Sequence, residues 1–475
     1  MNKQLITTLA LATSVFVSGC AMLEPRVPEA QPSIPAEWPL PPVTSAGADA
    51  HPPEATTEGL VVADVGWRDF FADPRLEELI AQALDNNRDL RVAILNVERA
   101  RAQYRIQRAD RLPSLGANAT LERTGGDAPV QEMYTAGVGL AAFELDLFGR
   151  VRNLSQAALQ QFLATEESGR AAQLTLIAEV ANAWLTLAAD RELLEISERT
   201  LQTHEESWRL TQQRHELGAV SGLELNQSRT LVETARADVA RYAGQVARDG
   251  NALNLLVGQP VEPSLLPDRF LPQVSGLGPL PAGVPAEVLL RRPDVMAAEH
   301  RLLSANANIG AARAAFFPSI SLTGMVGSAS PELSGLFESG TGFWSFSPQI
   351  NIPIFQGGRL RAALGMAHVD RDIALAQYER AIQAGFREVA DALALSSTLA
   401  RQRDALEDLV GASGNALELS QARYDAGLVS YLELLDAQRT HYQAQQSLVQ
   451  VQLGEQANRV MLYRVLGGGW VERTP

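Results

Sequence analysis

The residue whose chemistry stands out most is an aspartate, Asp436, which lies three residues before Arg439. Carboxylates form strong ionic links with arginine, and such links can hold an aperture closed. If copies of the chain assemble about an axis, their Asp436 side chains form an acidic ring, which can select or hold cations. The chemistry offered here is therefore electrostatic rather than catalytic.

Residue types that usually carry catalysis are scarce. The six histidines are scattered, and Cys20 is the single cysteine, so zinc sites and cysteine catalysis lack ligands and nucleophiles. Lys3 is the single lysine. A glycine pattern at residues 137–142 resembles a dinucleotide fingerprint, but it lies in a strand pattern and no helix follows. We expect no enzyme, no cofactor and no metal.

A repeat in the sequence predicts the structural elements around Asp436. Residues 214–225 recur as residues 423–434, and the same offset of 209 positions aligns residues 149–150 with residues 358–359. Self-similarity on this scale predicts two structurally equivalent halves in one chain.

Each copy of the repeated motif predicts a tight reversal between two helices. Gly218 and Gly427 suit the left-handed position after a helix. The next helix would begin with a serine cap and a glutamate three residues later, which together make a capping box: Ser221 with Glu224, and Ser430 with Glu433.

The two copies differ beside this turn. Gln227 in the first copy becomes Asp436 in the second, and His215 becomes Tyr424. The differences indicate either an added task for one copy or neutral drift, and turn formation alone explains the shared residues.

Proline is absent from residues 130–259 and from residues 354–474. Proline breaks helices, so these stretches permit helices over residues 150–217 and 359–426, each about 100 Å long if continuous. Shorter helices over residues 221–256 and 430–465 would return beside them. Helices of this length favour a coiled-coil cylinder.

Apolar and polar residues alternate in four shorter segments, around residues 115–121, 134–140, 319–323 and 343–354. Period two with one apolar face predicts strands that contact lipid on one side and water on the other. Aromatic residues at 316–317 and 343–346 resemble an interfacial girdle. Four strands cannot close a barrel, so membrane crossing would require oligomers.

The N-terminus predicts export and anchoring. Residues 1–19 read as a signal peptide, and residues 17–20 resemble a lipobox that ends in Cys20, which would be acylated, for example by palmitate. The alternative is an ordinary signal with an incidental cysteine. Residues 20–65 read as an extended tether. The formal charge of −15 disfavours nucleic acid.

Three longer stretches carry a resemblance to a known family, at residues 143–150, 283–295 and 305–318. They read Phe-Glu-Leu-Asp-Leu-Phe-Gly-Arg, Gly-Val-Pro-Ala-Glu-Val-Leu-Leu-Arg-Arg-Pro-Asp-Val and Ala-Asn-Ala-Asn-Ile-Gly-Ala-Ala-Arg-Ala-Ala-Phe-Phe-Pro. The chain resembles the outer membrane factor (TolC-type) family of efflux channels, in particular its lipoprotein branch.

The resemblance implies a homotrimer with a twelve-stranded membrane barrel and a helical tunnel into the periplasm of a Gram-negative bacterium. It implies a repeat over residues 66–260, a linker over 261–284 and a second repeat over 285–468. The implied partners are a periplasmic adaptor, an inner-membrane pump of the RND type and outer membrane lipid. It gives gate roles to Arg423, Tyr424 and Asp436.

The resemblance also implies that the tips of the two reversals contact the adaptor, at Gly218, Val220, Ser221, Gly427, Val429 and Ser430. Whether Asp425 or His215 adds to the gate stays open.

Three functions follow from these observations. The favoured one is a passive exit duct for small toxic solutes such as drugs. The others are a duct for type I protein secretion and a periplasmic coiled-coil lipoprotein without a pore, which would have no need of lipid-facing strands.

Overall fold

The structure is a computed structural model that describes residues 23, 25–39, 62–127, 129–270, 274–276, 280, 283 and 285–474. The signal peptide and Cys20 lie outside the described residues. Within the predicted tether, residues 25–39 form neither helix nor strand. They are nevertheless docked on the protein, since Gln31 donates its backbone N–H to Glu379 at 3.0 Å and Trp38 stacks on Phe386 at 4.9 Å.

Helices make up most of the chain. Two of them are very long, α5 (Arg150–Glu216) and α9 (Arg359–Asp425), with 67 residues each. Each reverses into a shorter helix, α6 (Gly222–Val257) and α10 (Tyr431–Val465), as the repeat predicts. The other helices of the described residues are α2 (Trp67–Phe70), α3 (Pro74–Asn86), α4 (Arg88–Ala109), α7 (Pro285–Leu290) and α8 (Pro293–Ala314). Short 3-10 turns are η2 (Val62–Asp64), η3 (Pro263–Leu265) and η4 (Leu333–Gly335).

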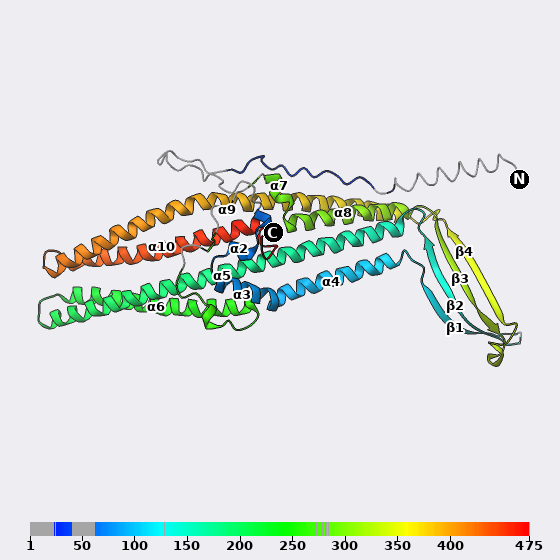
Figure 1. The fold of residues 1–475 in the computed structure, drawn as a ribbon, viewed down its shortest axis with the longest axis horizontal. Helices are drawn as coiled ribbons and strands as arrows, with labels where there is room; N and C mark the ends of the chain where they lie inside the picture. Colours follow the sequence, from blue (N-terminus) through cyan, green and yellow to red (C-terminus); the bar gives the residue numbers. More distant parts are fainter. Residues whose placement is uncertain are drawn as a thin grey trace. The chain divides into compact units, whose positions relative to one another are not determined.

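The four predicted strands form one antiparallel sheet in chain order, β1 (Leu115–Thr124), β2 (Gln131–Leu145), β3 (Ser319–Ser330) and β4 (Gly342–Asn351) (Figure 1). One face carries apolar rows that cross all four strands. These rows are Leu115, Leu140, Gly324 and Phe346, and then Ala117, Val138, Val326 and Trp344.

The opposite face is rich in glycine and hydroxyl groups. Asn118, Gly137, Gly327 and Phe343 form one of its rows. Phe343 therefore lies on the other face from Trp344, because neighbouring residues of a strand point to opposite sides. Trp344 and Phe346 thus lie on the apolar face, where the predicted aromatic girdle requires them, and Phe343 does not.

A β-bulge in β2 keeps its apolar side chains on one face. The register shifts between Leu140 and Phe143, with Ala142 at a φ of 44°. The extra residue reverses the alternation, so that Phe143 and Leu145 continue the apolar face opposite Leu322 and Ile320. Sequence alternation alone did not reveal this bulge.

The chain divides into two compact units. One consists of residues 1–32, 95–167 and 296–381 and includes the sheet, and the other consists of residues 33–94, 168–295 and 382–475. The core of the second unit includes Trp184, Leu185 and Leu253, all at most 1% exposed. Tyr463 stacks on Phe70 at 3.9 Å and donates to the Val65 carbonyl at 2.7 Å, which ties the end of the second repeat to the start of the first.

Among the described helices, α5 alone has the length and composition to cross a membrane, with an 18-residue window of mean hydropathy 1.2. However, 56% of that window is buried inside the chain. Such burial is typical of a core helix in a bundle. The strands therefore remain the candidates for crossing the membrane.

Candidate functional site

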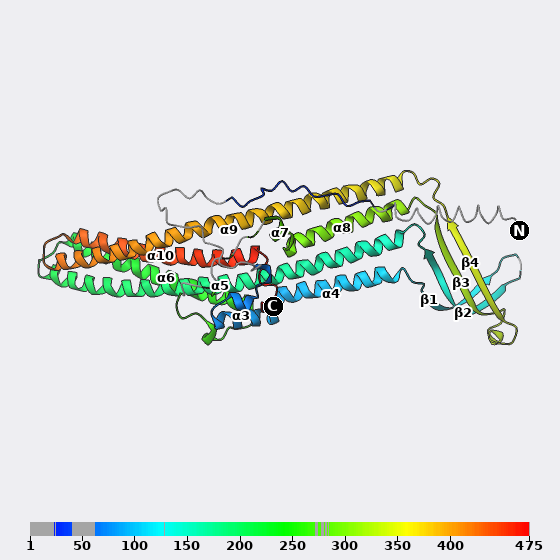
Figure 2. The same ribbon diagram turned by 45° about the horizontal axis from the view of Figure 1, so that its top comes forward.

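The two helix reversals have the same backbone geometry, and they lie together at one end of the second unit (Figures 1 and 2). Gly218 and Gly427 adopt φ values of +74° and +72°. In the first, the N–H groups of Gly218 and Ala219 bond to the carbonyls of His215 and Arg214, at 2.9 and 2.8 Å. The second repeats this pattern between Gly427 and Leu428 and the carbonyls of Tyr424 and Arg423. Both are Schellman motifs, as the glycines predict.

The caps of the returning helices depart from the prediction. Ser221 caps α6, since its hydroxyl accepts from the Glu224 N–H at 3.2 Å, but Ser430 makes no side-chain cap. In the described structure, neither glutamate side chain accepts a hydrogen bond from the backbone N–H of the serine three residues before it. Glu224 and Glu433 are bound instead by residues of α9, so the capping-box prediction is wrong for their side chains.

A short hydrogen bond joins the two halves of the chain at the turns. The Tyr424 hydroxyl, on α9, donates to Glu224 Oε1, on α6, at 2.6 Å. The guanidinium carbon of Arg214 lies 5.6 Å from the centre of the Tyr424 ring. The ring also meets Tyr431 edge to face, with centroids 5.6 Å apart. Tyr424 therefore contacts both helical hairpins, the one made by α5 and α6 and the one made by α9 and α10.

Burial of Tyr424, reinforced by the nearby Glu224 carboxylate, raises the pKa of its hydroxyl to about 12. The pKa shift means that the hydroxyl keeps its proton throughout the physiological pH range. A neutral tyrosine donating to a charged carboxylate is a charge-assisted hydrogen bond, which is stronger than a neutral pair.

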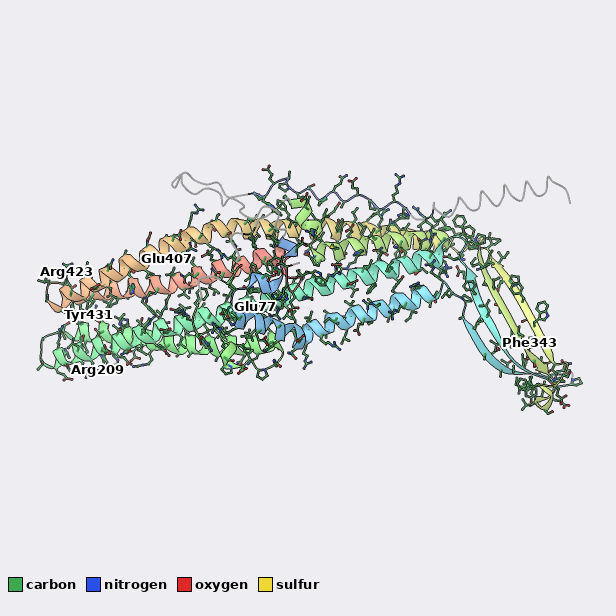
Figure 3. All side chains as sticks on the ribbon, viewed as in Figure 1. Glu77, Arg209, Phe343, Glu407, Arg423 and Tyr431 are labelled. Carbon is green, nitrogen blue, oxygen red and sulfur yellow. The ribbon has the colours of Figure 1, made fainter. Side chains whose placement is uncertain are left out.

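Arg423 lies on the exposed side of the same turn, close to the start of α10 (Figure 3). Its Nη1 atom is 2.9 Å from Glu433 Oε1, and both side chains are about half exposed. Asp436 is exposed and makes no hydrogen bond or ion pair within the described part of the chain. The structure thus brings Arg423 and Tyr424 together at the turn, but it pairs neither of them with Asp436.

The six predicted tip residues all lie at the two reversals. Gly218, Ser221, Gly427 and Ser430 are exposed, and Val220 and Val429 are partly buried. His215, the repeat partner of Tyr424, faces back into its own turn, with Nδ1 3.0 Å from the Val220 carbonyl. His215 therefore stabilises its own turn in the first half, whereas Tyr424, at the equivalent position of the second half, links the two halves.

A second ionic site, which the sequence did not reveal, lies in the stretch that reads Arg-Arg-Pro-Asp. Arg292 is 6% exposed and binds Asp294 at 2.8 Å and Glu388 at 2.7 Å. It also donates to the Val465 carbonyl at 3.2 Å. These bonds hold the pKa of Asp294 below its usual value although burial opposes them. Arg292 joins α8, α9 and α10, so the stretch serves the architecture.

Comparison with known proteins identifies the family. The model of the outer membrane efflux protein family matches residues 79–259 and 284–468. The antibiotic efflux pump outer membrane protein ArpC and the toluene efflux pump outer membrane protein TtgC, both from Pseudomonas putida, are each 44% identical over 100% of this chain and 97% of their own length.

A solved structure agrees with these relatives. The open state of the MtrE outer membrane channel of Neisseria gonorrhoeae is 40% identical, and it superposes with a TM-score of 0.86 over 95% of this chain and 99% of that one. With its two repeats, four-stranded sheet and paired long helices, this chain belongs to the outer membrane efflux protein family.

Proposed function

We propose that three copies of the chain form the outer membrane channel of a tripartite efflux pump, which conducts small toxic solutes passively from the periplasm to the exterior. The observation that carries this proposal is the sheet. Its four strands have one apolar and one polar face, and Trp344 and Val326 on the apolar face are 76% and 68% exposed. Three such sheets make twelve strands, enough for a barrel with a polar lumen.

Supporting arguments come from the relatives and the N-terminus. ArpC is named for antibiotics and TtgC for toluene, so small solutes of low polarity are the proposed cargo. Lipid on Cys20 would hold the chain at the outer membrane, and the docked residues 25–39 would follow it. Residues 66–260 and 285–468 would be the two halves of each protomer.

The gate in this proposal lies at the helix reversals. Tyr424 and Glu224 hold the second hairpin against the first, and Arg423 with Glu433 braces the turn. Asp436 is exposed and free of partners in the described chain, and so its carboxylate is available for the acidic ring or for a link to a neighbouring protomer. A periplasmic adaptor would contact the exposed turns at Gly218, Ser221, Gly427 and Ser430 and release the gate, and an inner-membrane pump would supply the energy.

A planar lipid bilayer tests the channel. Purified full-length protein should give discrete conductance steps that are small and infrequent in the wild type, because the gate is closed. Protein that inserts into the bilayer without any conductance, in the wild type and in gate variants alike, would refute a pore and favour a structural lipoprotein.

A further inference from the structure

A second polar contact joins three helices at Tyr442 of α10, about three turns of that helix away from the reversals. Its hydroxyl donates to Asp238 Oδ2 of α6 at 3.0 Å and lies 2.9 Å from Ser197 Oγ of α5. Ser197 is fully buried, and its hydroxyl proton can go to the Tyr442 oxygen or to the Leu193 carbonyl, which lies 2.8 Å away. Asp238 is also fixed by Arg241, at 2.7 Å. The Tyr442 contact therefore fastens the second repeat to both helices of the first.

An apolar cluster lies beyond this contact, on the side away from the reversals. The cluster there consists of buried side chains that are at most 5% exposed, namely Ala189, Leu193, Ile196, Tyr242 and Val449. A close-packed cluster of this kind resists displacement of its helices, because any shift loses contacts on all sides.

Between Tyr442 and the reversals the packing is loose. Two open cavities of about 510 and 660 Å³ lie there among α5, α6, α9 and α10, and both are lined by His204 and Tyr442. Two buried polar atoms in the lining of the smaller cavity, His204 Nδ1 and Gln438 Oε1, have no hydrogen-bond partner in the described structure. Both cavities are open to solvent, so water can enter them and satisfy such atoms. Contacts through water can be exchanged as a helix shifts.

We infer that Tyr442 is the positioning residue that limits the movement of the gate. When the reversals separate, the part of α10 between Tyr431 and His441 moves across the hydrated cavities, and the part beyond Tyr442 stays fixed. This inference rests on the proposed channel function. It assigns to Tyr442 a role distinct from that of Tyr424, which holds the closed state at the end of the moving segment.

Tyr442→Phe tests the inference, because it removes the hydroxyl and leaves the ring. Because the contact is kept in both the closed and the open state, its loss should not favour either state directly. It should instead let the opening movement spread past residue 442, so that the conductance of the open channel rises above that of the wild type. Tyr104→Phe is the matched control, since the Tyr104 ring stacks on Phe162 but its hydroxyl has no bond in the described structure. If wild-type protein conducts and Tyr442→Phe behaves like Tyr104→Phe, the inference is overturned, whereas failure of the wild type to conduct contradicts the channel itself.

Spin-label distances separate a positioning role from general loosening. Pairs of introduced cysteines can be placed at exposed sites, Arg229 with Thr440 on the reversal side and Arg248 with Gln450 beyond Tyr442. In Tyr424→Phe the first pair should shift or broaden and the second should stay unchanged, and adding Tyr442→Phe should extend the change to the second pair. If both distances change equally while Tyr442 is intact, Tyr442 does not limit the part of α10 that moves. Ser197→Ala, which removes the smaller partner, gives a second and milder variant for the same measurements.

Discussion

Replacing Tyr424 by phenylalanine removes the hydroxyl that bridges the two hairpins, and it should open the proposed gate. The hydroxyl donates to Glu224 at 2.6 Å, and bonds to charged groups contribute about 1.5–3 kcal/mol when buried. Both side chains are partly exposed, and a freed Glu224 can be hydrated, so the lower end applies. About 1.5 kcal/mol per protomer corresponds to roughly a tenfold shift toward the open state. If three protomers must release together, the factors multiply to roughly a thousandfold.

Single-channel recording measures this shift as the fraction of time that a channel is open. Glu224→Gln keeps an acceptor without the charge and should give a smaller increase, and the double variant should gain little over Tyr424→Phe because the two changes remove one interaction. Tyr104→Phe controls for loss of a hydroxyl elsewhere. An open fraction for Tyr424→Phe within twofold of the wild type would refute the reasoning that this bond holds the gate.

Three further predictions follow. Asp436→Ala should give a leakier channel with weaker cation preference, and unchanged conductance and selectivity would remove Asp436 from the gate. Arg292→Met should destabilise the folded protein by about 1–3 kcal/mol, because it leaves the partly exposed carboxylates of Glu388 and Asp294 without their cation, and thermal melting of the purified protein measures the loss. Burial and the facing Asp249 raise the pKa of Asp190 to about 6, so the folded state binds this proton more tightly than the unfolded state. Stability from this group is therefore complete below about pH 4 and is lost as the pH rises through 6. After allowance for solvent screening, the difference between pH 7.5 and pH 5 should be about 1 kcal/mol in melting experiments, and Asp190→Asn should abolish it.

Much of the fold follows from local sequence rules. Proline-free stretches, the repeated glycines and the serine before α6 predict where the long helices run and reverse, because each of these effects acts within a few residues. The alternation of Leu115 to Leu121 and its counterparts predicts the strands for the same reason. The family resemblance predicts the trimer, the partners and the gate residues, and these remain proposals.

The remaining features depend on contacts between distant residues. Glu224 and Glu433 fit a capping box by spacing, yet their carboxylates bind Tyr424 and Arg423, which satisfy them more strongly than a backbone N–H would. The paired location of Glu224 and Tyr424, 200 residues apart, becomes visible only when the two hairpins pack together. The sequence does offer one hint, because Tyr424 replaces a histidine at the equivalent position of the first repeat.

The most direct test of the whole account is a single-particle structure of the full-length protein in lipid nanodiscs. We predict three copies around one axis, their strands closed into a twelve-stranded barrel with Trp344 and Phe346 facing lipid and Gly137 and Gly327 facing the lumen. Single chains with an open sheet, or a barrel with Trp344 and Phe346 inside, would contradict it.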